Sequence, residues 1–222
     1  MKREIKITAD GSSTIHLPDW NENYHSTHGA IQESKHVFLK QGFEGFLQSE
    51  IAILEIGFGT GLNCFLTFLA AEEKGIAVNY VGVEAYPVVA SEYGKLNYVE
   101  EANAIEKQLV FDEMHASSWE KKQTISPKFN LTKRQQFFKD ITDVDRFDLV
   151  YFDAFGAEHQ PELWTATIFE KMFIAMKIEG VLVTYSAKGS VRRAMQEVGF
   201  KVERLEGPPG KREMLRATKV AH

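Results

Sequence analysis

Length, composition and charge place this 222-residue chain among ordinary folded proteins. Hydrophobic residues make up 44% of the chain and charged residues 26%, which excludes disorder over its whole length. The single cysteine, Cys64, excludes an internal disulfide framework. No apolar stretch is long enough to span a bilayer, and polar residues follow Met1 where a signal peptide would be apolar. We therefore expect a cytoplasmic protein with no membrane partner.

The net charge of −5 is distributed unevenly along the chain. Between Ser186 and His222, nine basic residues stand against four acidic residues, whereas the rest of the chain is strongly acidic. Such asymmetry is typical of a protein that offers one face to an anionic partner. A solvated helix face followed by a basic strand explains the same composition equally well. The charge distribution therefore does not decide between an anionic partner and an ordinary solvated face.

The first 50 residues predict a small mixed segment. Short strands are expected near residues 5–7 and 15–17, separated by the Asp10-Gly11 turn, and one or two helices between Thr27 and Phe46. We expect residues 1–50 to be an extension that packs near the ligand site of a core formed by residues 51–222. The whole chain, residues 1–222, would then be a single domain.

From residue 51 the pattern becomes a regular alternation of strands and helices. Strands are expected at 51–56, 78–83, 147–152, 180–185, 201–205 and 213–218, and helices from 62 onward and at 88–99, 161–176 and 190–198. Residues 112–138 fit less well, and we expect a hairpin at 119–134 before a strand at 135–138. This order predicts an α/β fold with a Rossmann-like, doubly wound, mainly parallel sheet. Because only the turn at 207–210 separates the last two strands, the last strand should run antiparallel.

The strongest motif is Leu54-Glu55-Ile56-Gly57-Phe58-Gly59-Thr60-Gly61-Leu62-Asn63, which follows an apolar strand and opens an apolar helix. Its glycines permit positive φ and leave no Cβ to block a ligand. A dinucleotide site would place its third glycine three residues after the second, and Glu55 would repel a pyrophosphate. S-adenosylmethionine (SAM) carries an ammonium and a sulfonium group but no phosphate, so it fits this loop better than NAD does. The alternative is a tight strand-to-helix turn that binds nothing.

Two further acids follow expected strands at the same edge of the sheet. Glu84 lies 23 residues after Gly61, where a carboxylate can accept hydrogen bonds from both ribose hydroxyls. Asp140 follows the expected strand at 135–138, so it would lie near the adenine amino group, which needs an acceptor. Because Asp140 shares an acidic loop with Asp143 and Asp145, a solvent-exposed position is nearly as good an interpretation.

Asp153 ends the expected strand at 147–152, at the edge where doubly wound sheets bind their ligands. A carboxylate there could orient a nucleophilic amine or take up its proton as the N–C bond forms. A free alkylammonium has a pKa near ~10, so methyl transfer needs the neutral amine and benefits from a nearby proton acceptor. A cap for the following helix is the alternative role.

Several longer strings occur in an order that is more specific than the glycine loop. They are Glu33-Ser34-Lys35-His36-Val37-Phe38-Leu39, the loop itself, Phe152-Asp153-Ala154-Phe155, Pro161-Glu162-Leu163-Trp164-Thr165, the segment 184–193 and Gly210-Lys211-Arg212-Glu213-Met214-Leu215. Together they resemble the tRNA 5-methylaminomethyl-2-thiouridine methyltransferase family, the MnmC type. The resemblance covers about residues 20 to 218.

The resemblance implies a Rossmann-like class I SAM-dependent methyltransferase that acts on the wobble uridine of bacterial tRNA. The implied reaction methylates the primary amine of 5-aminomethyl-(2-thio)uridine. The residues that it implies for SAM binding are Glu33, Glu55, Gly57, Gly59, Gly61, Asn63, Glu84 and Asp140. It implies Asp153 at the point of methyl transfer and a tRNA-facing set of Lys188, Arg192, Arg193, Lys211 and Arg212.

We expect neither a metal nor a flavin. His25 and His28 lie three residues apart, but no third histidine or cysteine cluster accompanies them. Many members of the family fuse this domain to a flavin-dependent oxidase that acts on the same uridine, and 222 residues leave no room for it. A separate enzyme would then supply the aminomethyl intermediate.

Three other functions stay open at this point. A SAM-dependent methyltransferase that acts on a small molecule or a protein would need the same glycine loop. A non-catalytic Rossmann-like partner subunit would not bind SAM at all. An NAD enzyme is disfavoured by the glycine spacing and by Glu55.

Overall fold

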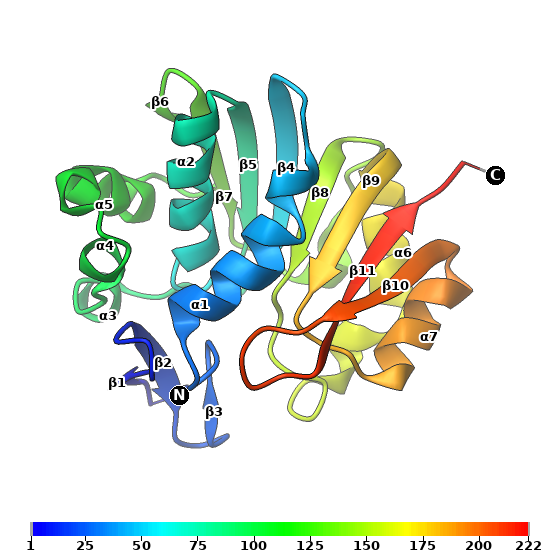
Figure 1. The fold of residues 1–222 in the computed structure, drawn as a ribbon, viewed down its shortest axis with the longest axis horizontal. Coiled ribbons are helices and arrows are strands. Elements are labelled where there is room, and N and C mark those ends of the chain that lie inside the picture. Colours follow the sequence, from blue (N-terminus) through cyan, green and yellow to red (C-terminus); the bar gives the residue numbers. More distant parts are fainter. Residues whose placement is uncertain (1, 222) are drawn as a thin grey trace.

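The computed structural model describes residues 2–221, and an eight-stranded sheet forms its centre (Figure 1). The strands lie in the order β10 (Phe200–Glu206), β11 (Glu213–Lys219), β9 (Met176–Thr184), β8 (Phe147–Phe152), β4 (Glu50–Ile56), β5 (Ala77–Val83), β7 (Phe129–Arg134) and β6 (Lys122–Ser126). The five inner strands β9, β8, β4, β5 and β7 run parallel to one another. The chain winds outward from β4 through β5 to β7 and then returns to β8. The switch point therefore lies between β4 and β8, where such sheets bind ligands at the carboxyl ends of their strands.

Antiparallel strands close both edges of this sheet. β11 pairs antiparallel with both β9 and β10, which confirms the predicted direction of the last strand. At the opposite edge, β6 pairs antiparallel with β7 and forms the hairpin that was expected between residues 119 and 134. The mainly parallel, doubly wound fold predicted from the sequence is confirmed.

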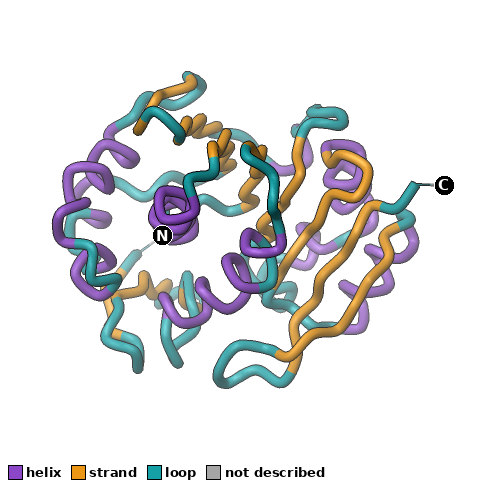
Figure 2. The backbone as a smooth tube through the Cα atoms, turned by 45° about the horizontal axis from the view of Figure 1, so that its top comes forward, coloured by secondary structure: helices purple, strands orange, loops and turns teal. Residues whose placement is uncertain are grey.

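Helices cover both faces of the sheet (Figure 2). Successive residues at the end of β8 illustrate this, because Tyr151 belongs to one apolar cluster and Phe152 to the other, and both are fully buried. No helix within residues 2–221 is long and apolar enough to cross a bilayer. The α-helices are α1 (Ala30–Ser34), α2 (Leu62–Lys74), α3 (Ala90–Tyr93), α4 (Tyr98–Glu101), α5 (Gln108–Ala116), α6 (Ala166–Ala175) and α7 (Gly189–Glu197). Short turns are the π-helix η1 (Lys35–Lys40) and the 3-10 helices η2 (Phe43–Gly45), η3 (Ile105–Lys107), η4 (Phe138–Asp140) and η5 (Pro161–Trp164).

A small three-stranded sheet precedes α1 and lies beyond the carboxyl ends of the central strands (Figure 1). Its strands are β1 (Glu4–Ile7), β2 (Ser13–Leu17) and β3 (Glu22–Asn23). Side-chain hydrogen bonds fasten it to the core. The Ser13 N–H donates to Asn97 Oδ1 over 2.7 Å, and the Arg3 guanidinium donates to the Glu92 carboxylate over 2.9 Å. We call residues 2–50 the N-terminal layer.

Three predicted elements differ from the structure. The helix expected at 88–99 is two short helices, α3 and α4, because the Asn97 side chain bonds Ser13 and Gly11 of the N-terminal layer instead of continuing a helix. The strand expected at 135–138 is absent from the described residues. β7 takes its place beside β5, since its Phe129 and Leu131 supply the buried positions. The helix expected at 161–176 breaks at the extended Thr165 into η5 and α6.

Candidate functional site

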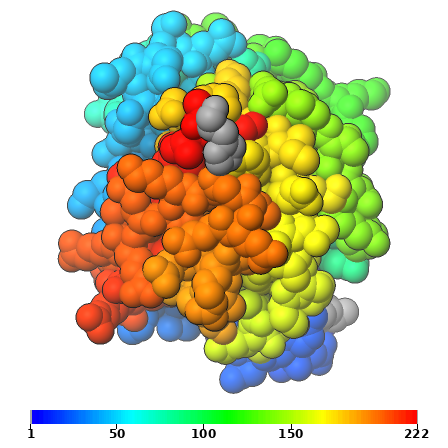
Figure 3. Space-filling view, turned by 90° about the vertical axis from the view of Figure 1, so that its right-hand side faces the viewer, coloured from blue at the N-terminus to red at the C-terminus, as the bar shows by residue number. Residues whose placement is uncertain are grey.

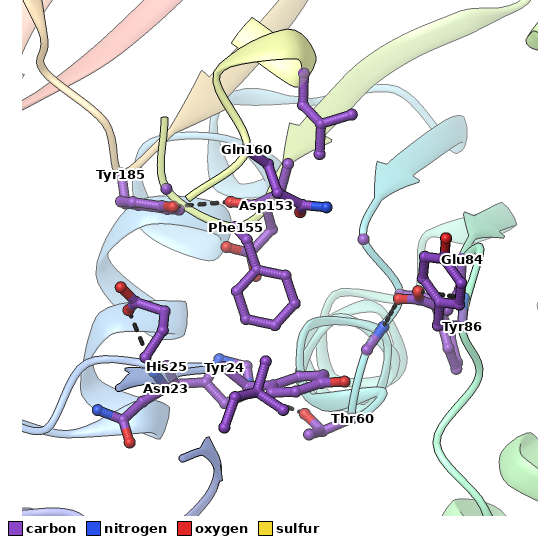
Figure 4. A pocket seen from close by; sticks show the side chains of 18 of the residues that line it. Asn23, Tyr24, His25, Thr60, Glu84, Tyr86, Asp153, Phe155, Gln160 and Tyr185 are labelled. Atoms are coloured by element: carbon purple, nitrogen blue, oxygen red, sulfur yellow. Dashed lines mark hydrogen bonds between the residues drawn. The ribbon is translucent and has the colours of Figure 1, made fainter. Parts of the chain in front are cut away.

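A cavity of about 1050 Å³ opens at the carboxyl ends of β4, β5, β8 and β9 (Figure 4). Its walls come from the loops that follow these strands, from the N-terminal layer and from the β10–β11 loop. In Figure 4 the Phe155 ring lies in the middle, with Glu84 and Tyr86 on one side and Tyr185 on the other. We call these sides the glycine-loop half, lined by residues 57–60, 84–86 and 137–139, and the Tyr185 half, lined by Glu33, Tyr185 and Lys211.

The turn between β4 and α2 requires its glycines. The φ angles of Gly57, Gly59 and Gly61 are all positive, at 90°, 49° and 72°. Residues other than glycine rarely adopt such angles. A Cβ on Gly57 would come within 2.6 Å of the Asp153 carbonyl oxygen, and one on Gly59 within 3.2 Å of the Tyr24 ring. Gly57 and Gly59 line the cavity, whereas Gly61 lies behind it and begins α2. Backbone atoms of the loop therefore form the cavity floor.

Glu84 lies in the glycine-loop half, directly after β5. Its Oε2 accepts the Gly59 N–H over 3.0 Å and its Oε1 accepts the Tyr86 N–H over 2.9 Å. The carboxylate is thus held against the glycine loop at the cavity wall. Each oxygen keeps a lone pair for a further donor, as an acceptor for a vicinal diol would need.

Glu55 does not line the cavity, contrary to its expected contact with SAM. It is 1% exposed, and its two oxygens accept hydrogen bonds from Asn63 Nδ2 and the Tyr80 hydroxyl, each over 2.9 Å. Burial raises the pKa of the Glu55 carboxyl well above its usual value. The structure therefore places Glu55 beneath the loop, where it orients Asn63.

Asn63 joins Glu55 to Asp153. Its Nδ2 donates a second hydrogen bond to Asp153 Oδ2 over 2.8 Å, and its Oδ1 accepts one from the Ser34 hydroxyl. Asp153 follows β8 and lines the cavity between its two halves. Burial and, to a smaller extent, the nearby Glu33 charge raise the pKa of Asp153 to about 7, although the Asn63 hydrogen bond and the Lys211 charge oppose the rise. A carboxyl with this pKa can accept a proton near neutral pH.

Three aromatic side chains near Asp153 were missed by the sequence reasoning. The Phe155 ring lies edge-on to Tyr24 at 4.9 Å and to Trp20 at 5.7 Å between ring centroids. The Trp20 ring also stacks on His159, whose Nε2 lies 2.7 Å from a Glu22 carboxylate oxygen. Phe155 could have been noticed because it ends the string that begins at Phe152. Trp20 and Tyr24 carried no comparable signal, because only the folded N-terminal layer brings them to the cavity.

The Tyr185 half contains an ion pair between two distant parts of the chain. Lys211 Nζ lies 2.5 Å from Glu33 Oε1 and 4.0 Å from the centre of the Tyr185 ring. Glu33 Oε2 accepts the Ser26 N–H over 2.9 Å, and the Tyr185 hydroxyl donates to the Ala154 carbonyl oxygen over 2.7 Å. Lys211, which was expected to face tRNA, therefore points into the cavity.

Comparisons with known proteins are consistent with this geometry. Residues 100–220 match the model of a family described as S-adenosyl-L-methionine-dependent methyltransferase. The chain belongs to this family. It is 27% identical to the tRNA 5-methylaminomethyl-2-thiouridine biosynthesis bifunctional protein MnmC of Actinobacillus pleuropneumoniae serotype 5b (strain L20), over 94% of this chain and 34% of that protein. It is 28% identical to the MnmC protein of Hydrogenovibrio crunogenus, over 96% of this chain and 33% of that protein.

A solved structure extends the likeness to three dimensions. The crystal structure of MNMC2 from Aquifex aeolicus has a TM-score of 0.75 and 25% sequence identity, and the match covers 100% of this chain and 72% of that one. The chain spans about a third of the length of the curated bifunctional relatives. The methyltransferase fold and the use of SAM as cofactor are thus shown for this chain.

The residues of the glycine-loop half fit SAM. Gly57 and Gly59 line the cavity with backbone atoms alone, and Glu84 offers acceptors for ribose hydroxyls. Asn63 lines the cavity beside them. Asp140 is exposed and does not line the cavity, so its proposed contact with adenine stays a prediction. Its expected position at the end of a strand was wrong, because η4 occupies that segment.

Four of the five basic residues that were expected to face tRNA lie outside the cavity. Arg193 and Arg212 are exposed, and the Arg192 side chain is half-buried on α7. Lys188 is exposed and pairs with Glu158 over 2.8 Å. α7, β10 and the end of β11 form one continuous face of the molecule (Figure 3). Lys211 is the exception, because it pairs with Glu33 inside the cavity.

Proposed function

We propose that this methyltransferase transfers the methyl group of SAM to the primary amine of 5-aminomethyl-(2-thio)uridine at the wobble position of tRNA. The observation that carries the proposal is Asp153, a carboxylate with a pKa raised to about 7 at the boundary between the two halves of the cavity. The names of the MnmC relatives, which refer to the biosynthesis of 5-methylaminomethyl-2-thiouridine in tRNA, support tRNA as the substrate and this nucleoside as the product. A small-molecule or protein acceptor is the competing function.

In this proposal the amine enters as an ammonium group and loses one proton to Asp153. Asn63, whose Nδ2 bonds both Glu55 and Asp153, holds the Asp153 carboxylate in place for this step. When bound, SAM supplies an electrophilic methyl group, whose bond to sulfur breaks as the N–C bond forms. Phe155 and the N-terminal layer exclude water from the reacting amine. The sulfur keeps the electron pair of the broken bond and leaves as the thioether of S-adenosylhomocysteine. The step therefore ends with a secondary ammonium group and a protonated Asp153, which releases its proton to solvent.

We further propose that residues 1–50 extend the 51–222 core and complete its active site as one domain. Contacts between the layer and the glycine loop support this. His25 Nε2 lies 2.8 Å from the Thr60 hydroxyl oxygen, and burial lowers the pKa of His25 to about 4, so its ring is neutral. The Tyr98 hydroxyl donates to the same Thr60 oxygen over 3.1 Å. The loop is thereby held from both sides.

The exposed cations Lys188, Arg193 and Arg212 and the half-buried Arg192 are proposed to bind tRNA phosphates. They lie at the start of α7, along α7 and just before β11, on the side of the sheet where Tyr185 follows β9. Such contacts would position the anticodon loop over the cavity, since phosphate contacts fix register and base contacts specify the target. Another catalytic unit, fused or separate, must supply the aminomethyl group before this reaction.

The direct test is methyl transfer to tRNA isolated from a strain that lacks this protein. We expect the purified protein and SAM to convert the aminomethyl nucleoside to its methylaminomethyl form, seen by mass spectrometry of the digested tRNA as the gain of one CH₂ unit. The Asp153→Asn variant serves as the control. Methylation of a small amine or a protein at a higher rate, with tRNA unchanged, would make the competing function correct.

A further inference from the structure

The order of the strands places the Tyr185 half on the far side of Asp153 from the glycine loop. Moving across the carboxyl edge, Glu84 follows β5, the glycine loop follows β4, Asp153 follows β8 and Tyr185 follows β9. Lys211 lies two residues before β11, the next strand in the sheet. Figure 4 likewise shows Glu84 and Tyr185 on opposite sides of Asp153. Ligand groups that bind near Tyr185 therefore approach Asp153 from the side opposite the ribose acceptor.

Tyr185 and Glu33 are held rigidly in this half. The Tyr185 ring packs edge-on to Trp164 at 5.9 Å, and its hydroxyl is tied to the Ala154 carbonyl oxygen. The Glu33 side chain is 10% exposed, and its carboxylate is fixed by the Ser26 N–H. One face of an aromatic ring and one carboxylate oxygen thus converge on a single point. Lys211 Nζ occupies that point.

A carboxylate and an aromatic face together are suited to a primary ammonium group. The ring attracts a cation through its quadrupole, and the carboxylate pairs with its charge. The Nζ of lysine is itself a primary ammonium on a methylene group. It has the same chemistry as the protonated aminomethyl group of the proposed acceptor.

We propose that Glu33 and Tyr185 form a binding subsite for a primary ammonium group, which the side chain of Lys211 fills in the structure. Lys211 would leave the subsite when the ligand amine enters, and the amine would then lie beside Asp153. The identity of that amine as the tRNA acceptor rests on the proposed function. The α-ammonium of SAM has the same chemistry, although the subsite's position beyond Asp153 favours the acceptor.

The subsite can be tested without any methyl-transfer assay, by adding ethylammonium chloride to the purified full-length protein. In Lys211→Ala, ethylammonium should take the place of Nζ and raise the melting temperature by about 3 °C at ten times its dissociation constant. The wild-type protein and Lys211→Ala/Glu33→Gln should show no more than the shift caused by sodium chloride. Lys201→Ala, which removes a cation from an exposed position on β10, is the matched control and should behave as wild type.

Equal shifts in wild type, Lys211→Ala and the double variant would overturn the proposal. If Lys211→Ala does not fold, Lys211→Ser keeps the subsite open while hydrating Glu33, and the same comparison applies. Because this readout needs no tRNA, it can fail or succeed independently of the proposed function.

Steady-state kinetics then identify which ammonium uses the subsite. For the acceptor amine, Glu33→Gln should raise the KM of tRNA about tenfold, since a charged hydrogen bond is lost, with the KM of SAM unchanged. Lys211→Ala should lower the KM of tRNA, because the competing side chain is gone. The same pattern in the KM of SAM would assign the subsite to the cofactor's ammonium. A higher KM of tRNA in Lys211→Ala, with no ethylammonium response, would show that Lys211 binds phosphate instead.

Discussion

The two halves of the cavity are assembled from the chain in different ways. Most of the glycine-loop half comes from two consecutive strand-and-turn units, to which residues 137–139 after β7 are added. Gly59 and Glu84, which bond each other, are 25 residues apart. The Tyr185 half joins Glu33 to Lys211 across 178 residues. Residues that are close in the sequence therefore form most of the glycine-loop half. The opposite half exists only once the sheet, the N-terminal layer and the β10–β11 loop have come together.

The largest effect is expected where the two halves meet. Asp153→Ala should lower the single-turnover rate of methyl transfer by about 10²–10⁴-fold, the usual contribution of a positioned proton acceptor. SAM affinity, measured by calorimetry, should change little, because Asp153 is assigned to the amine. Asp153→Asn preserves the shape of the contact with Asn63 and controls for packing. A rate unchanged by both substitutions would reduce Asp153 to a structural role.

This contrast between a locally assembled half and a half assembled from distant segments explains which site residues could be predicted from the sequence. The glycine loop and Glu84 could be predicted from glycines and acidic residues at the ends of expected strands. The spacing of a strand, a turn and a helix fixes the positions of such residues locally. Glu55 was misplaced because sequence position shows that a carboxylate ends a strand, but not that Tyr80 and Asn63 bury it. Lys211 looked like a surface cation in a basic tail. Only the fold reveals that its partner comes from α1.

The fold itself was predictable except where tertiary contacts overruled the local pattern. Burial on both faces made the central strands apolar, so their positions and the antiparallel last strand were correct. The strand predicted at the end of the region 112–138 was wrong, because β7 is the strand that pairs with β5. The interrupted helix at 88–99 depended on Asn97 bonding residues more than 80 positions away.

The next largest effect should fall on the glycine-loop half. Gly59→Val should weaken SAM binding by about 100-fold or more, since a β-branched residue is strained at positive φ and would crowd the ligand space. Calorimetric titration with SAM measures the effect, and circular dichroism checks the fold. Gly45→Val is the control, because a Cβ on Gly45 meets nothing within 4 Å. Near wild-type affinity in Gly59→Val would remove the loop from the binding site.

Asn63 connects the halves, so its loss should cost stability as well as rate. Asn63→Ala removes the donor that the buried Glu55 and Asp153 share, and leaves Glu55 with the Tyr80 hydroxyl alone. We expect the free energy of unfolding to fall by about 2–3 kcal/mol. Urea titration at pH 8 measures this change. Asn130→Ala removes an amide from the β6–β7 hairpin and should have a smaller effect. Equal losses in the two variants would contradict the bridging role of Asn63.

A smaller effect is expected from the exposed basic face. Replacing Arg192, Arg193 and Arg212 with glutamine should flatten the salt dependence of tRNA binding by roughly one unit of slope for each lost phosphate contact. SAM affinity should not change. The control replaces Lys121, Lys122 and Lys128 with glutamine, around β6 at the opposite edge of the sheet. An equal change in the salt dependence of tRNA binding in both triple variants would show that tRNA binds through the overall charge of the protein and not through this face.

The most direct test of Asp153 as the meeting point of the two halves is the pH dependence of single-turnover methyl transfer to tRNA. Because the pKa of Asp153 is raised to about 7 and the carboxylate is the active form, the rate should fall about tenfold per pH unit below pH 7. Above pH 7 it should level off, since the bound ammonium can then always give its proton to Asp153. The limb near pH 7 should be absent in Asp153→Asn. A rate that keeps rising toward pH ~10, the pKa of a free alkylammonium, in both proteins would contradict the account.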